Sequence, residues 1–101
     1  KSGVDPSAEI NAIRARAYGS GYTPYTNGSQ DANMNAILDE YLREFIGEGK
    51  RWWALRRAGN TYVFNAINPV YLPASQTYKL ALPISITMLN TDPKLTQTAG
   101  Y

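Results

Sequence analysis

Residues 60–101 carry no sustained helical or strand periodicity, which is the strongest constraint on what this chain can fold into. Residues 62–67 are compatible with a brief strand or a helical turn, and residues 78–84 are apolar and extended in character. Prolines, which remove a backbone donor from helices and sheets, interrupt the segment at four positions, Pro69, Pro73, Pro83 and Pro93. So long an irregular segment is uncommon in a self-contained domain. We therefore expect a tail that lies across a body outside these residues, which makes the chain the C-terminal segment of a larger protein.

The N-terminal part of the sequence, in contrast, has clear helical patterns. A first helix is predicted over residues 6–18, with Asp5 as its cap and Gly19 as its stop. Its buried stripe consists of apolar residues at helical spacing, namely Ile10, Ile13 and Ala17.

A second helix is predicted over residues 31–46, with Asp31 as its cap. It has the strongest amphipathic stripe in the sequence, formed by Met34, Ile37, Leu38, Tyr41, Leu42, Phe45 and Ile46. The segment between the two helices is rich in Gly, Ser, Thr and Asn, as loops are. We expect the two helices to form an antiparallel hairpin of the kind found in tetratricopeptide-like arrays, where a single pair cannot bury both of its faces.

A short third helix is predicted over residues 50–57, between Gly49 and Gly59, with Trp52 and Trp53 as its apolar bulk. The predicted fold class is therefore mainly α: a tetratricopeptide-like helix pair followed by a long irregular tail over residues 60–101. Residues 1–101 are treated as one segment of a larger helical domain.

The composition excludes several kinds of function. The chain has no cysteine and no histidine, so thiolate metal sites, disulfides and the commonest catalytic base are absent. No apolar run reaches the roughly 18 residues that a membrane-spanning helix needs, and the first residues do not resemble a signal peptide. The net charge is only +2. We expect no catalytic residue, no metal ligand and no cofactor.

Carboxylates on the second helix are candidates for acid–base chemistry. Glycosidases use two carboxyl groups that converge on a cleft. Here they lie on the polar face of an amphipathic helix, so solvated ion pairs are expected, with one at i,i+4 spacing between Asp39 and Arg43. The face consists of Asp39, Glu40, Arg43 and Glu44.

Aromatic and basic residues on the third helix have three interpretations. Stacking rings beside arginines are typical of nucleic-acid binding, and an exposed indole is equally suited to stacking on a sugar. Large aromatic residues are more often buried, so we expect these residues to fix the helix against the body of the protein. The residues are Arg51, Trp52, Trp53, Arg56 and Arg57.

Three stretches together resemble the SusD/RagB family of outer-membrane nutrient-binding lipoproteins. Residues 10–17 (INAIRARA) are similar to its Asn-x-Ile-Arg-x-Arg-Ala helix. Residues 37–57 are similar to its Ile-Leu-Asp-Glu-Arg-x-x-Glu-Phe stretch, followed by Gly-Glu-Gly-His-Arg-Trp-Phe-Asp-Leu-Arg-Arg. Residues 82–101 resemble its Pro-Ile-Pro and Thr-Asn-Pro-Asn-Leu-Thr-Gln-Asn-Pro-Gly-Tyr terminus. The sequence departs from these patterns at Tyr41, Lys50, Ala54, Ser85, Met88, Thr98 and Ala99.

The resemblance implies a surface-exposed lipoprotein at the cell outer membrane, attached by a lipid anchor upstream of these residues. It implies an α-helical protein that captures oligosaccharides, or sometimes peptides, and passes them to a SusC-like TonB-dependent transporter. It implies no enzymatic activity and no nucleic-acid partner.

The resemblance leaves the nutrient, the oligomeric state and the glycan-binding residues open, because the sugar-contacting rings of the family mostly come from upstream regions. Tyrosines in loop or tail positions are the remaining candidates for ligand contact, and none is assigned a binding role. They are Tyr18, Tyr22, Tyr25, Tyr62, Tyr71 and Tyr78. Two alternatives are a helical-repeat module that binds a protein without binding glycan, and a glycan-cleaving enzyme. We also expect the tail over residues 95–101 to be docked through the terminal Tyr101.

Overall fold

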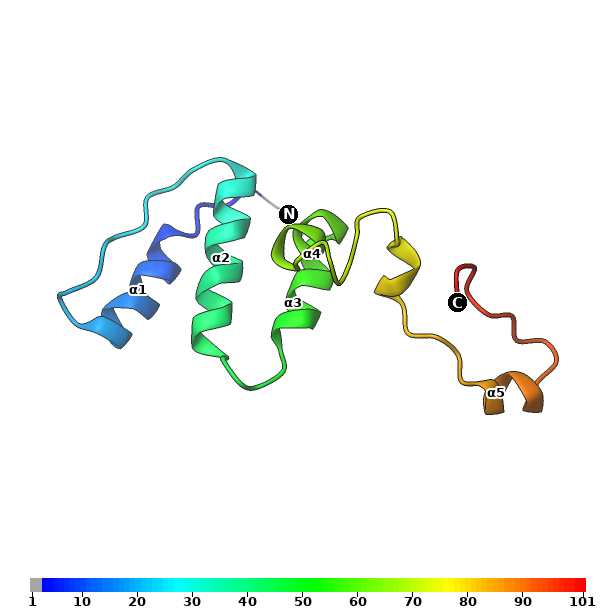
Figure 1. Ribbon diagram of the computed structural model, residues 1–101. Helices are drawn as coiled ribbons and strands as arrows, with labels where there is room; N and C mark the ends of the chain where they lie inside the picture. Colours follow the sequence, from blue (N-terminus) through cyan, green and yellow to red (C-terminus); the bar gives the residue numbers. More distant parts are fainter. Residues whose placement is uncertain (1–2) are drawn as a thin grey trace. The chain divides into compact units, whose positions relative to one another are not determined.

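The fold is mainly α, as the sequence predicted, in a computed structural model that describes residues 3–101. No strand occurs within those residues. One compact unit ends at Val63 and a second runs from Phe64 to Tyr101. The helices, drawn in Figure 1, are α1 (Ser7–Tyr18), α2 (Gln30–Glu44), α3 (Arg51–Ala58), α4 (Asn60–Ala66), the 3-10 turn η1 (Thr77–Leu80) and α5 (Ile86–Thr91).

Helix α1 begins one residue after its predicted start, and its N-cap residue is Pro6 rather than the predicted Asp5. Asp5 holds the first turn, because its Oδ1 accepts hydrogen bonds from the Ser7 backbone N–H at 2.8 Å and from the Ser7 hydroxyl at 2.5 Å. The hydroxyl bond is the main reason that the pKa of Asp5 lies below its ordinary value. Gly19 ends the helix with a φ of 61°, a left-handed value that favours glycine, and its N–H donates to the Ala15 carbonyl.

Helix α2 is capped by Ser29, and the prediction that Asp31 caps it was wrong. The Ser29 hydroxyl accepts from the Ala32 N–H at 3.2 Å, which satisfies one of the free amides of the first turn. Asp31 instead lies inside that turn, where a carboxylate is favoured by the helix dipole, and accepts a 2.7 Å hydrogen bond from the Tyr62 hydroxyl. The helix ends at Glu44, two residues before its predicted end.

Helices α1 and α2 run in the same direction, and the predicted antiparallel hairpin was wrong for this pair. Arg14 pairs with Glu40 and Arg16 pairs with Glu44. The residue numbers of the paired positions increase together on the two helices, as they do when helices are parallel. Figure 1 shows the connecting loop returning alongside α1 before α2 begins.

The loop from Gly19 to Ser29 is long enough to make this return. Fully extended, it spans roughly 36 Å, whereas the 12-residue α1 is only about 18 Å long. Loop residues pair with earlier and earlier positions of α1. The Thr23 carbonyl accepts from Arg14, and Tyr25 pairs with Asn11. Because the loop runs back along the whole length of α1, α2 starts at the same end of the helix pair as α1.

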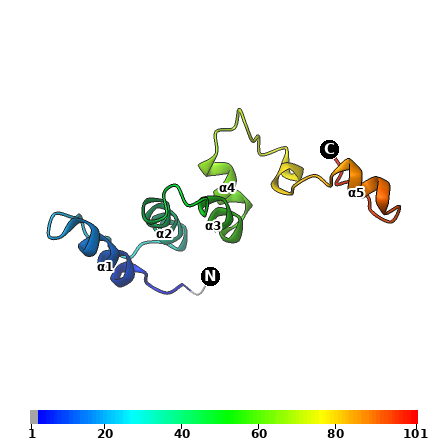
Figure 2. The same cartoon turned by 90° about the horizontal axis from the view of Figure 1, so that it is seen from below.

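The helical hairpin of this chain is formed by α2 and α3. The Arg51 guanidinium donates to the Leu38 carbonyl and lies 3.9 Å from the Asp39 carboxylate. Tyr62, further along the chain, reaches back to Asp31, so these contacts run in opposite directions along the two segments. Helix α2 thus contacts both α1 and α3, and it lies between them in Figures 1 and 2.

Each unit has a small apolar core. In the first unit Val63 is completely inaccessible to solvent, and it is joined by Ile10, Leu38, Leu55 and Ala58. In the second unit the buried apolar residues are Leu72 and Leu80. Such small cores account for the many large apolar side chains that remain exposed, because short chains bury proportionately little surface.

The segment over residues 60–101 is less irregular than predicted. It contains α4, η1 and α5, so residues 62–67 are largely helical, and η1 replaces the start of the expected extended run. Ala81, directly after η1, does have an extended backbone. Ser85 caps α5 by accepting from the Met88 N–H at 3.3 Å. Short capped turns of this kind produce little periodicity, which is why the sequence did not reveal them.

The end of the tail folds back within the second unit, which supports the predicted docking. The Tyr101 hydroxyl donates to the Ala81 carbonyl at 2.6 Å, and its ring meets the Tyr78 ring edge-on with centroids 5.2 Å apart. The Gln97 amide both donates to the Ile84 carbonyl and accepts from the Ile84 N–H. Gly100 lies against the Tyr78 ring, where an added Cβ would come within 2.7 Å of ring atoms.

Substitution of Gly100 tests the docked tail. Gly100→Ala is expected to separate the Tyr78 and Tyr101 rings, because the new methyl group overlaps the ring and φ at this position is +109°. The measurement is the set of NMR contacts between the two rings. Gly49→Ala is the matched control, since φ there is +69° with no atom near the added carbon. Persistence of the ring contacts in Gly100→Ala would contradict the docking.

The hydrogen bond from Tyr62 to Asp31 predicts a pH-dependent stability. It raises the pKa of Tyr62 above its ordinary value of 10.0, with smaller contributions from burial and from the Asp31 charge. Because the folded state favours the protonated phenol, this stabilisation is complete below pH 10.0 and is lost as the pH rises through the raised pKa. In urea unfolding, the difference in unfolding free energy between wild type and Tyr62→Phe should therefore shrink as the pH rises above the raised pKa of Tyr62. A difference that stays constant would argue against the bond.

Candidate functional site

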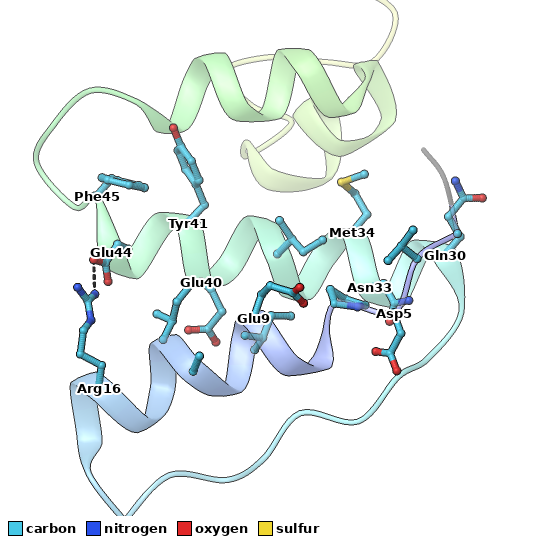
Figure 3. Close-up of a pocket in the computed structure, with 17 residues that line it drawn as sticks. Asp5, Glu9, Arg16, Gln30, Asn33, Met34, Glu40, Tyr41, Glu44 and Phe45 are labelled. Carbon is cyan, nitrogen blue, oxygen red and sulfur yellow. Dashed lines mark hydrogen bonds and ion pairs between the residues drawn. The ribbon is translucent and has the colours of Figure 1, made fainter.

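A groove of about 880 Å³ lies between α1 and α2, and we call it the α1–α2 groove. Figure 3 shows both helices and the segment before α1 contributing side chains to it. Most of its lining is apolar: Val4, Ile10, Ile13, Met34, Ile37, Tyr41 and Phe45. Its charged members are Asp5, Glu9, Arg16, Glu40 and Glu44. A groove of this composition is suited to burying apolar surface from another segment or molecule.

Glu40 is the central charged group between the two helices. Only 4 % of it is exposed, so the predicted solvated ion pair was wrong for this residue. Its Oε1 accepts from Arg14 Nε at 2.7 Å and Nη2 at 2.5 Å, and from Arg43 Nη1 at 2.6 Å. The parallel packing of α1 brings Arg14 over this face of α2, which the sequence pattern of α2 alone does not show. A buried carboxylate needs such partners because its desolvation is costly.

The other carboxylates of this face form exposed pairs, as predicted, although with different partners. Glu44 pairs with Arg16, drawn as dashes in Figure 3. The side chain of Asp39 lies 3.9 Å from Arg51, and Arg43 pairs with Glu40 rather than with Asp39. Asp39, Glu40 and Glu44 each lie beside an arginine, so all three carboxylates of this face are engaged in ion pairs.

Two asparagines that the sequence pattern did not single out fix the loop from Gly19 to Ser29. Asn33 is buried, and its Oδ1 accepts from the Tyr25 hydroxyl at 2.7 Å and from the Gly28 N–H at 2.9 Å. Asn11 both donates to the Tyr25 carbonyl and accepts from its N–H. The available signal was that Asn33 stands one turn before Ile37, on the buried stripe of α2.

The aromatic and basic residues of α3 do not form one cluster. Trp53 is 64 % exposed, whereas Trp52 is partly buried. Arg51 is occupied with α2, and Arg56 donates to Asn60. The packing role predicted for Trp53 is therefore not fulfilled by contacts within the described part of the chain.

Lys50 stands where the sequence departs from the family histidine, and it interacts locally. Its Nζ lies 2.8 Å from Glu48, and this hydrogen bond is the main reason that the pKa of Lys50 is raised. The same Nζ lies 4.2 Å from the centroid of the Phe45 ring, a cation–π distance. These contacts support the turn between α2 and α3.

The tyrosines divide into structural and exposed groups. Tyr25, Tyr62 and Tyr101 use their hydroxyls for hydrogen bonds within the chain. Tyr18 and Tyr71 are exposed.

A family model described as the SusD family matches residues 3–101. The chain belongs to the SusD family. Neither the search of curated proteins nor the search of solved structures produced a match. Membership places this chain in a family of nutrient-binding, non-catalytic proteins that is typically associated with the outer membrane. None of the helices within residues 3–101 has the length and apolarity needed to cross a bilayer.

The structure gives a physical reason for two of the stretches that resemble the SusD family. Residues 10–17 supply Arg14 and Arg16, and residues 37–45 supply their partners Glu40 and Glu44. The two arginines are two residues apart on α1 and the two glutamates are four residues apart on α2, and both ion pairs lie across the same helix interface. These motif residues therefore hold two helices together.

The buried position of Glu40 predicts a large effect of its removal. Glu40→Gln leaves Arg14 without its countercharge, so the free energy of unfolding should fall by about 3–5 kcal/mol. Glu44→Gln, at the more exposed pair with Arg16, should cost at most about 1 kcal/mol. Denaturant unfolding of both variants measures the difference. Equal losses would show that the two ion pairs contribute alike.

Proposed function

We propose that this chain is the C-terminal part of a SusD-like, surface-exposed lipoprotein that binds glycan and delivers oligosaccharides to a SusC-like TonB-dependent transporter. The protein would be anchored at the outer membrane by a lipid upstream of these residues. It would need no cofactor and carry out no bond cleavage. The match to the SusD family over residues 3–101 is the observation that carries this proposal.

The exposed apolar surface supports the idea that these residues belong to a larger body. The α1–α2 groove leaves Ile37 partly exposed, and Trp53 and Ile46 are exposed on or beside α3. Contiguous apolar surfaces of this kind are rare on monomeric soluble proteins unless another surface covers them. In the proposed protein, further helices would cover the groove.

Within that protein, this chain would act mainly as scaffold. Its polar side chains largely bind one another, as at Glu40, Asn33 and Asn11. Sugar sites instead present aromatic faces and polar groups toward a cavity. Most of the glycan-contacting residues are accordingly proposed to lie upstream.

The α1–α2 groove favours one alternative, a helical-repeat module that binds a protein partner without binding glycan. Its apolar lining suits an amphipathic helix, since helix-in-groove recognition depends on such surfaces. A glycan-cleaving enzyme is not favoured, because the carboxylates of α2 are engaged in ion pairs.

Calorimetry on the intact protein tests the primary proposal. Titration with a panel of neutral and acidic oligosaccharides should show saturable binding to at least one of them, and chromatography of the recovered sugar should show no shorter products. Appearance of shorter products would support an enzyme instead. Failure of every oligosaccharide to bind, with retained binding of an amphipathic helical peptide, would support the interaction module.

A further inference from the structure

A second, smaller hollow of about 400 Å³ lies between the C-terminal end of α1, the following loop and α2. We call it the arginine–tyrosine hollow. Its lining differs from that of the α1–α2 groove, because it combines two guanidinium groups with two phenol rings and loop backbone. The residues are Arg14, Tyr18, Gly21, Tyr22, Thr23 and Arg43. The hollow is shallow and widely open to solvent, so it can contact one residue of a longer ligand and leave the rest outside.

The two arginines of this hollow differ in how many of their nitrogens are hydrogen-bonded within the protein. Arg14 uses Nε and Nη2 on Glu40 and Nη1 on the Thr23 carbonyl, so the protein occupies all three of its nitrogens. Arg43 is 53 % exposed and uses only Nη1, again on Glu40. Within residues 3–101 no acceptor contacts its Nε and Nη2. Arg14 thus positions the loop, while Arg43 keeps donors directed outward.

The loop wall of the hollow is anchored at Gly21, whose N–H donates to the Tyr18 carbonyl, and at Thr23, whose carbonyl accepts from Arg14, and the loop is held further along at Tyr25 and Gly28. Asn11 binds both backbone groups of Tyr25, and Asn33 binds Tyr25 and Gly28. The Arg14 guanidinium carbon also lies 5.9 Å from the Tyr25 ring centroid. A loop fixed at so many points loses little further entropy when a ligand binds beside it. Tyr18, 58 % exposed, and Thr23 then present a ring and a hydroxyl at the rim.

The charge of the hollow selects the ligand. Arg14 and Arg43 carry two positive charges and share the single negative charge of Glu40, which leaves one positive charge in surplus. A monoanionic carboxylate balances that surplus and matches the planar fork of a guanidinium. A phosphate group carries more negative charge than the hollow can balance.

We propose that the arginine–tyrosine hollow binds a uronic-acid residue of an oligosaccharide, with the sugar carboxylate on Arg43 and the sugar ring against Tyr18. The tyrosine ring offers an apolar face to the C–H groups of the sugar and a hydroxyl at its edge. Thr23, which also lines the hollow and is exposed, has a hydroxyl that can bind a sugar hydroxyl. This inference rests on the proposed glycan-binding function and names a class of sugar for it.

Calorimetry with the intact protein tests this assignment, using an oligogalacturonate and the neutral oligogalactose of the same length as probes. The oligogalacturonate should bind more tightly. Arg43→Gln should weaken its binding by at least about tenfold, because a charge-assisted hydrogen bond is lost. Tyr18→Ala should weaken it roughly threefold or more, through the lost ring contact. Arg57→Gln, which removes an exposed arginine of α3 outside the hollow, should bind like wild type.

The outcomes separate this inference from the function on which it rests. Equal binding of charged and neutral sugars, or wild-type affinity in Arg43→Gln and Tyr18→Ala, overturns the inference and leaves glycan binding intact. A glutamate oligomer is added as a competitor of bound oligogalacturonate. If it competes as strongly as unlabelled oligogalacturonate does, the ligand is a peptide carboxylate and the choice of a sugar is overturned. Absence of binding to any oligosaccharide overturns both. If thermal unfolding shows that Arg43→Gln is disturbed, Tyr18→Ala decides, because the hydroxyl of Tyr18 is not among the hydrogen bonds that hold the fold.

Discussion

The carboxylate of Glu40 is the interaction on which the arrangement of the first unit depends. A charge that is only 4 % exposed has to be matched by donors, and the donors come from α1 and from α2 itself. The position of α1 against α2 is therefore set by an ion pair as well as by apolar contact. The same Arg14 also binds the Thr23 carbonyl, so one carboxylate orders two helices and the loop between them.

The return of this loop along α1 decides what surfaces the unit presents. Because α1 and α2 run in the same direction, the loop returns along α1 and contacts Asn11 and Arg14, whereas Ile10, Ile13 and Ile37 line the α1–α2 groove. The side that the loop contacts becomes polar and fixed, with Asn11 and Asn33 as its hydrogen-bonding centres. The apolar α1–α2 groove and the polar arginine–tyrosine hollow thus both follow from the direction in which α2 runs relative to α1.

The sequence was sufficient for what depends on local periodicity. The spacing of Ile10 and Ile13, and the stripe from Met34 to Phe45, placed α1 and α2 to within two residues, and the motif stretches identified the SusD family. The sequence was insufficient where the position of a residue or helix depends on contacts between segments far apart in the chain. Burial of Glu40 requires Arg14 to lie above it, and the parallel course of α2 requires the loop to retrace α1. The sequence also could not decide between Ser29 and Asp31 as the cap of α2, because serine and aspartate are about equally favoured as N-cap residues.

The contacts of Tyr101 are concentrated in a single side chain. Its hydroxyl donates to the Ala81 carbonyl and its ring meets the Tyr78 ring, so loss of this one residue abolishes both contacts. The two hydrogen bonds between Gln97 and Ile84 do not involve it. Damage to one tyrosine would therefore loosen the second unit at one place and leave it held at another, and mass spectrometry is the appropriate check on each preparation.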